Sequence, residues 1–473
     1  MINLKEVIVQ LDLKEYEKIE SNFKKNKSVS FLFLLRNYRN SNDSDKNINE
    51  QLGITPNAFY VLKSRLYDKI QNSMSIDLFL NQEETASLVL QIPEICYNKP
   101  RETAIAFLHK LESQLKRFDM HLELLTVYST LKKIHILSDK YYHYSQLYNK
   151  QVSFVLAFEK AEETLSEFCV KLNQYDFSRS SDLVEQLKFL NVQIINISAH
   201  CSSKKVLIIK NLMELQLILF KINKNNSKKK MLSLLNATQL YFDDLPKTFF
   251  YKKWEVVLDY LFFEYYFSKK KHPQLAEYFR KVNNELRNIF LYNHVGIVSK
   301  FLITKLLYCS ELNKRNAFSD KIDPSVFLLD SNDSFTEVRL SLYKSVVCLY
   351  QGNYKKGILH LIKLKDEFVL VNHPYINLNI QLTLLVLYIF DDNFLDAKLC
   401  IPVINRKIRT LKDKKHHHLL SLLAFFRLVI EQKTDDLILK KQKKYFSQFL
   451  LGNIEKNTHI EYLIPLLKKK YYN

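Results

Sequence analysis

Apolar residues recur along almost the whole chain at the spacing of a helical face. Between residues 104 and 115 the intervals between successive apolar positions are 3, 1, 3 and 4, at Ala104, Phe107, Leu108, Leu111 and Leu115. Residues with these separations lie on one side of an α-helix. Strict alternation of apolar and polar residues over five or more positions is scarce. The pattern therefore predicts an all-α protein.

The same periodicity predicts further helices over residues 122–137, 141–172, 181–200 and 205–222. Glycine occurs 5 times and proline 9 times in 473 residues. Turn-rich β folds and glycine-lined phosphate sites need more glycine than this. We therefore expect long helices joined by short polar links, in a chain long enough for more than one core.

A period of about 40 residues is present in the C-terminal half. The segments 351–360 and 391–400 each follow an apolar helix and open another, and Gly357 and Ala397 occupy the same slot 40 residues apart. Weaker copies of this slot are Ala276 and Ala317, which gives spacings of 41, 40 and 40. A small residue at this slot lets two helices of a hairpin approach closely. Fixed periods of this size are typical of helical solenoids.

These residues resemble tetratricopeptide-like repeats, in which a helix ends at Gly, an aromatic follows two residues later and a small residue three after that. The matching residues are Gly352, Tyr354 and Gly357 in one copy and Phe394 and Ala397 in the next, where Asp392 replaces the Gly. The period exceeds the family's usual ~34 residues, so the repeats are degenerate and HEAT-like helical pairs remain an alternative. The resemblance implies an α-solenoid of antiparallel helix hairpins.

The pattern divides the chain into an N-terminal helical module at 1–80, long helical hairpins at 81–225 and degenerate repeats at 226–473. This layout is similar to a group of uncharacterised bacterial proteins. The similarity is carried by Leu13, Glu15, Phe31–Phe33, residues 57–67 and the stretch from Leu108 to Tyr128. It implies an architecture and no particular activity.

Residues 46–70 resemble a helix-turn-helix. Gly53 suits a turn that needs positive φ, Thr55 suits a helix N-cap and Pro56 suits the first helical position. The core positions of such a motif are all apolar here, at Ile48, Leu52, Ile54, Phe59 and Leu62.

The candidate nucleic-acid contacts of this segment are the polar residues that its second helix would expose. Asn and Lys can contact base edges and Arg can bind phosphate, which makes the candidates Thr55, Asn57, Tyr60, Lys63, Ser64 and Arg65. The alternative is a plain helical hairpin that caps the array, because caps, Pro and Gly are general helix punctuation.

The net charge of +20 suggests an acidic partner, although the lysine clusters also fit solvated helix ends. The six cysteines contain no CxxC pair, which favours buried thiols in a reducing compartment. The first residues do not resemble a signal peptide, and apolar runs are shorter than the ~18 residues that span a bilayer. We therefore expect a cytoplasmic protein without a membrane span.

No catalytic, metal or cofactor motif is recognisable in the sequence. HExxH, a Gly-rich phosphate loop and a GxSxG elbow are absent, and the adjacent histidines 416–418 point about 100° apart on a helix. We therefore expect a non-enzymatic scaffold, without cofactor, that binds an acidic protein or peptide on the concave surface of its repeats. The alternative is a DNA-binding regulator that uses the helix-turn-helix, with the repeats for sensing or dimerisation. The sequence leaves the oligomeric state open.

Overall fold

The protein is all-α in the computed structural model. The structure describes residues 4–11, 13–26, 28–40, 43–73, 82–222, 228–243, 245, 249–270, 272–285, 295–311, 334–367, 373–410, 418–432, 435–456, 460 and 462–471. No strand occurs among these residues, and no helix in these ranges is long and apolar enough to cross a membrane.

The chain forms two compact units, and several helices between residues 140 and 243 contribute to both. The first unit comprises 1–161, 197–207 and 243–246, and the second comprises 162–196, 208–242 and 247–473. The domain boundaries that we expect at residues 80 and 225 stay predictions. The first unit contains α1 (Leu4–Gln10), α2 (Leu13–Lys25), α3 (Val29–Asn40), α4 (Asp45–Leu52), α5 (Pro56–Ser73), α6 (Gln82–Leu90), α7 (Ile92–Asn98), α8 (Arg101–Arg117), α9 (His121–Ile134) and the start of α10 (Lys140–Ser178).

The second unit contains the end of α10, most of α11, α12 and α13, and all the described helices that follow. These are α11 (Ser181–His200), α12 (Lys204–Leu219), α13 (Lys228–Asp243), α14 (Phe249–Lys269), α15 (His272–Asn284), α17 (Val295–Glu311), α18 (Ser334–Gln351), α19 (Tyr354–Glu367), α20 (Pro374–Phe390), α21 (Phe394–Thr410), α22 (His418–Ile430), α23 (Asp436–Lys456) and α24 (Leu463–Tyr471). The helices predicted at 122–137, 141–172, 181–200 and 205–222 correspond to α9, α10, α11 and α12.

The first five helices share a core of their own. Its buried residues are Leu4, Val7, Ile8, Leu11, Ile19, Phe23, Leu34, Leu35, Tyr38, Ile48, Phe59, Leu66, Tyr67 and Ile70. Arg39 on α3 donates hydrogen bonds of 2.7–2.8 Å to the carbonyls of Ile8, Val9 and Leu11. This side chain supplies donors to carbonyls at the end of α1, which have no partner within their own helix.

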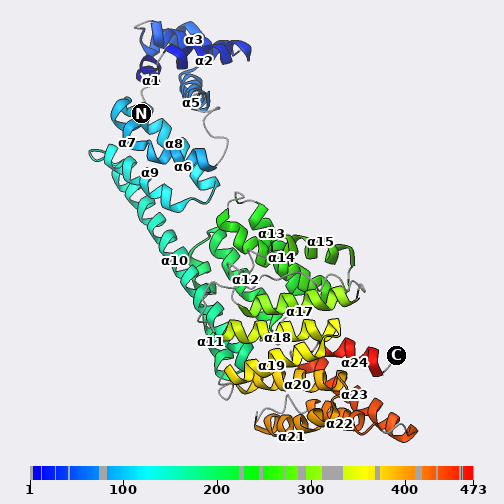
Figure 1. Ribbon diagram of the computed structural model, residues 1–473. Helices are drawn as coiled ribbons and strands as arrows, with labels where there is room; N and C mark the ends of the chain where they lie inside the picture. Colours follow the sequence, from blue (N-terminus) through cyan, green and yellow to red (C-terminus); the bar gives the residue numbers. More distant parts are fainter. Residues whose placement is uncertain are drawn as a thin grey trace. The chain divides into compact units, whose positions relative to one another are not determined.

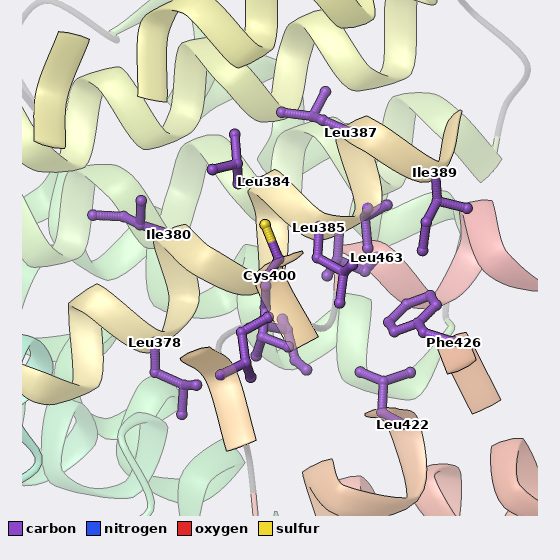
Figure 2. Close-up of a cluster of buried hydrophobic side chains, with 14 of the residues drawn as sticks. Leu378, Ile380, Leu384, Leu385, Leu387, Ile389, Cys400, Leu422, Phe426 and Leu463 are labelled. Atoms are coloured by element: carbon purple, nitrogen blue, oxygen red, sulfur yellow. The ribbon is translucent and has the colours of Figure 1, made fainter. Parts of the chain in front are cut away.

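Successive helices of the second unit pack against one another from α17 to α23 (Figure 1). Three hairpins follow in sequence, α18–α19, α20–α21 and α22–α23, and the second helix of each of the first two hairpins also contacts the first helix of the next. Their shared core gathers leucines and isoleucines of α20, such as Leu384 and Leu387, with Cys400 of α21, Phe426 of α22 and Leu463 of α24 (Figure 2). The core is therefore continuous across the hairpins.

Helix α20 is enclosed on all sides. Every residue from Tyr375 to Leu387 is buried, including polar side chains at Asn377, Asn379, Gln381 and Thr383. The Tyr462 hydroxyl lies 2.8 Å from Thr383 Oγ1, and Lys470 Nζ donates to the Ile389 carbonyl at 3.2 Å. The C-terminal segment thus covers α20, so the surface of this helix is not accessible to a partner.

The end of α10 is joined to α18 by a buried ion pair. Arg339 of α18 forms an ion pair with the Asp176 carboxylate, and its guanidinium also donates to the Asp176 carbonyl at 2.8 Å. Arg179 donates to Asp176 Oδ1 at 2.9 Å, and its guanidinium lies 5.5 Å from the ring centroid of Tyr375. The Arg339 and Asp176 side chains are 3% and 1% exposed, so this pair is desolvated.

Candidate functional site

The turn between α4 and α5 has the backbone geometry that the sequence predicts. Helix α4 ends at Gly53, which has φ +62° and donates its N–H to the carbonyls of Asn49 and Glu50. Helix α5 begins at Pro56, and the Ala58 N–H donates to Thr55 Oγ1 at 3.3 Å. Gly53 adopts the left-handed conformation without steric strain, and Thr55 caps the N-terminus of α5. Two local sequence signals therefore determine this turn.

In this helix pair, the predicted core positions are buried or half-buried and most of the predicted surface positions are exposed. Ile48 and Phe59 are buried, and Leu52, Ile54 and Leu62 are half-buried against the same core. Most of the candidate contacts are exposed: Thr55, Asn57, Tyr60, Ser64 and Arg65. Tyr60 is 63% exposed. The second helix therefore presents a polar face around one accessible ring.

Lys63 differs from the other candidates because it is held by the module itself. Its Nζ lies 2.6 Å from Asp45 Oδ2, and the Tyr38 hydroxyl donates to Asp45 Oδ1 at 2.6 Å. Burial alone would raise the pKa of the Asp45 carboxyl, but the hydrogen bonds from Lys63 and Tyr38 offset this and lower that pKa. Asp45 thus joins α3, α4 and α5, and the charge of Lys63 is engaged in that junction.

The module around this surface has little excess charge. Residues 1–73 contain 12 Lys and Arg against 9 Asp and Glu, a net charge of +3. Residues 354–470 contain 21 Lys and Arg against 11 Asp and Glu, a net charge of +10. Half of the chain's positive excess therefore lies in the C-terminal hairpins and not beside the helix pair of residues 46–70.

The turns of the C-terminal hairpins repeat the same backbone contacts 40 residues apart. The Asn353 N–H donates to the Cys348 carbonyl and the Asn393 N–H to the Tyr388 carbonyl, both at 2.9 Å. Positive φ recurs at 40-residue intervals, with φ +82° at Gly352, +57° at Asp392 and +53° at Gln432. The sequence gives no glycine signal at 392 or 432, so the third turn could not be read from it.

Gly357 occupies a close contact between helices, as the repeat pattern predicts. A Cβ atom built there would lie 3.0 Å from Leu387 Cδ2 and 3.2 Å from Cys348 Cβ. Ala397 is fully buried, while Tyr354 and Phe394 are half-buried at the starts of their helices. The Tyr354 ring lies 5.7 Å from that of Phe390, centroid to centroid.

The upstream copy of this slot is one residue away from the predicted one. Lys270 has φ +53° at the turn between α14 and α15, 82 residues before Gly352. Five residues after that turn comes Leu275, which is 1% exposed, whereas Ala276 is exposed. Ala276 therefore makes no contact comparable to that of Gly357, because the turn conformation sets which residue faces the neighbour. Ala317 lies outside the described residues.

A basic groove between α21 and α22 was not recognised from the sequence. It encloses about 800 Å³ and is lined by Lys398, Ile401, Pro402, Asn405, Arg406, Arg409, Arg427 and Glu431. All four of its cations are exposed, whereas Ile401, which also lines it, is only 5% exposed. Among the described lining residues Glu431 is the only acid, so positive charge dominates this groove.

The electrostatic potential around α21 is positive beyond the groove as well. The pKa of Lys407 is lowered, first by burial and then by the charges of Lys365 on α19 and of Arg406. Like charges that lower a lysine pKa indicate a region where cations outnumber acids. The spacing of Lys398, Arg406 and Arg409 by eight and three residues could have suggested a common face. Arg427, however, joins them only through the packing of α21 against α22.

The polar clusters of the first unit form packing contacts between helices. Glu112 on α8 receives hydrogen bonds from Lys116 Nζ at 2.6 Å and from the Tyr128 hydroxyl at 2.7 Å, and His109 Nδ1 lies 3.1 Å from it. Burial raises the Glu112 pKa, but these partners offset that effect and lower the pKa to about 2. Within the described residues no group of three or more His, Cys, Asp or Glu could hold a metal ion. Two of the three adjacent histidines lie outside these residues, and His418 is buried.

Comparison of the chain with protein-family models, with curated proteins and with solved structures finds no match.

Proposed function

We propose that this protein is a non-enzymatic helical-repeat scaffold of the tetratricopeptide-like kind, and that it binds an acidic segment of a protein partner. The observation that carries the proposal is the α21–α22 groove, which brings Lys398, Arg406, Arg409 and Arg427 together around one acid. Arginine forks pair with carboxylates through two parallel hydrogen bonds, so three arginines favour a carboxylate-rich ligand. A cytoplasmic location stays a prediction.

The repeat interpretation is supported by the hairpin turns. Positive φ at Gly352, Asp392 and Gln432 and the matching contacts around Asn353 and Asn393 have the period of 40 residues that the sequence indicates. Arrays of stacked hairpins commonly serve as binding surfaces, because every hairpin adds exposed side chains in a regular order.

The binding surface proposed here differs from the one expected from the sequence alone. A partner on the inner face would contact first helices such as α20, but α20 is buried along Tyr375–Leu387. The second helices keep an open outer face, and α21 carries exposed Lys398, Arg406 and Arg409 on it. The ligand therefore has to lie on the exposed face of a second helix such as α21, with Arg427 of the first helix α22 beside it.

The test is fluorescence anisotropy of a labelled 16-residue oligoglutamate titrated with the intact chain from low to physiological salt. We expect binding that weakens as salt rises, because exposed charges are screened within about 10 Å at 0.1 M salt. Oligolysine of the same length is the ligand control. Absence of oligoglutamate binding at low salt would overturn the proposal.

A matched pair of variants separates the groove from the general charge of the chain. Arg406→Gln/Arg409→Gln and Lys440→Gln/Lys441→Gln each remove two exposed positive charges, but only the first pair lines the groove. We expect the groove variant to weaken oligoglutamate binding about tenfold or more, since each charged hydrogen bond is worth roughly 1.5–3 kcal/mol. If the two variants weaken binding equally, binding depends on the net charge of the chain and the groove is not the binding site.

A second candidate function is a DNA-binding regulator that uses α4 and α5. It is favoured by the capped turn at Gly53 and Thr55 and by the exposed Asn57, Tyr60 and Arg65 on the second helix. In such motifs the first residues of the second helix contact base edges. The small net charge of the module weakens the non-specific electrostatic part of such binding.

Duplex DNA binding by the intact chain, measured across salt concentrations, tests the second candidate. Arg65→Ala is expected to weaken binding and lower its salt dependence, while Lys25→Ala, an exposed charge on α2, is the control. The candidate is rejected if Arg65→Ala binds as the native chain does, or if no binding occurs at low salt.

A further inference from the structure

The outer face of α21 is a stripe of exposed side chains that also includes the half-buried Asn405. At 100° per residue, positions 395, 398, 399, 402, 405, 406 and 409 fall within an arc of about 120°. The buried residues Ala397, Ile401, Ile404 and Ile408 lie on the opposite side. With a rise of 1.5 Å per residue, the stripe from Leu395 to Arg409 is about 21 Å long.

The stripe changes character along its length. Its first half carries Leu395 and Leu399, which are 82% and 69% exposed, with the exposed Lys398 between them in the sequence and the exposed Pro402 after them. Its second half carries Arg406 and Arg409, and Arg427 of α22 lies across the groove from them. Two leucines exposed four residues apart on a helix are neighbours in space, so they form one apolar patch next to the cations.

The start of the stripe is firmly positioned. The Asn393 carbonyl oxygen Oδ1 accepts from the Asp396 N–H at 3.3 Å, and Asn393 Nδ2 donates to Asp396 Oδ2 at 2.7 Å. These contacts cap the first turn of α21 and hold Leu395 in a helical conformation. The backbone that carries Leu395 and Leu399 is thus helical before any partner binds, so association costs little backbone entropy there.

From this geometry we infer that the acidic partner segment is bipartite. Bulky apolar side chains cover Leu395 and Leu399, and an adjacent run of carboxylates binds Arg406, Arg409 and Arg427. This inference rests on the proposed function, to which it adds the order of residues in the ligand. A helical segment of about 14 residues or an extended one of about six spans the stripe. The apolar half supplies affinity and the cationic half sets register and orientation.

The test compares three labelled 16-residue peptides with the intact chain: oligoglutamate, a block peptide with four leucines in one half and glutamates in the other, and a mixed peptide of the same composition with the leucines spread evenly. The block peptide is made in both directions, with the leucine half first or last. We expect the better block peptide to bind about tenfold more tightly than the mixed one, because covering an exposed leucine is worth about a decade in affinity.

The Leu395→Ser/Leu399→Ser variant is expected to remove the difference between block and mixed peptides while leaving oligoglutamate binding unchanged. Leu437→Ser/Leu451→Ser is the matched control, because these α23 leucines are 73% and 68% exposed and lie outside the groove lining. Equal binding of block and mixed peptides, or a difference that persists in the Leu395/Leu399 variant, overturns the inference. Failure of the native chain to bind oligoglutamate would instead overturn the proposed function.

Discussion

Replacement of Gly357 by valine tests the packing of the C-terminal hairpins most sharply. The nearest neighbour atoms of a new Cβ would be Leu387 Cδ2 at 3.0 Å and Cys348 Cβ at 3.2 Å. The leucine can change rotamer, but Cys348 Cβ is fixed to the backbone of α18, so that helix would have to shift. Overpacking of this kind costs about 1–3 kcal/mol, against a gain of about 0.3 kcal/mol from the better helix propensity of valine. The net expectation is a loss of about 2 kcal/mol.

Urea unfolding followed by Trp254 fluorescence measures this loss. Trp254 is the sole tryptophan, is 5% exposed in α14 and belongs to the same compact unit as Gly357. A loss of about 2 kcal/mol lowers the midpoint by roughly 1 M for an m-value of about 2 kcal/mol per molar. Ala276→Val is the control, since Ala276 is exposed and the change should cost less than about 0.7 kcal/mol. A native-like midpoint for Gly357→Val, or an equal loss for Ala276→Val, would refute the packing argument.

Four further predictions follow from single contacts. Gly53→Ala, at φ +62° with no atom within 4 Å of the new Cβ, should destabilise the first five helices by about 1–2 kcal/mol, measured as faster amide exchange in α4 and α5. Gln432→Gly should raise the urea midpoint. Glycine removes the backbone strain at φ +53°, and this gain exceeds the ~0.5–1 kcal/mol by which glycine's extra entropy stabilises the unfolded chain. Arg339→Leu should cost up to about 3 kcal/mol in the Trp254 assay, because it removes one of the two arginines paired with the buried Asp176 and leaves Arg179; no loss would contradict a stabilising role of the buried pair. Glu112→Gln should cost up to about 3 kcal/mol above pH 5, since the folded pKa of about 2 lies below the usual 4.5, and the difference from the native chain should vanish as pH falls towards 2 in thermal unfolding followed by circular dichroism.

Helical periodicity is the part of the fold that the sequence predicts well. Apolar spacing located the ends of α9, α11 and α12 to within three residues and the end of α10 to within six, and the turn signals Gly53, Thr55 and Pro56 located the start of α5. These features depend on residues close together in the chain, where steric and capping preferences act directly.

Features that depend on tertiary packing were beyond the sequence pattern. The residues Lys270 and Gln432 adopt positive φ without the glycine that usually marks it, so the turn that makes Leu275 the buried residue was placed one position late. Coverage of α20 by Tyr462 and Lys470 joins residues about 80 positions apart. No local signal encodes such a contact.

The basic groove illustrates the same limit for the candidate site. Arg427 and Arg409 belong to different helices, and only the packing of α21 against α22 places them around one volume. Lysine runs such as 440–441 and 468–470 are more conspicuous in the sequence, yet they do not line this groove. Clustering in space, and not density along the chain, is what defines a site for an acidic ligand.

Zero-length cross-linking tests the account's central claim most directly. A carbodiimide joins a carboxylate to a lysine amine only when the two are in contact, and Lys398 is the lysine that lines the α21–α22 groove among the described residues. With oligoglutamate bound to the intact chain at moderate salt, peptide mass spectrometry should find the dominant adduct on Lys398, and excess unlabelled block peptide should suppress it. Adducts spread over exposed lysines such as Lys440, Lys441 and Lys469, with none enriched at Lys398, would contradict the account.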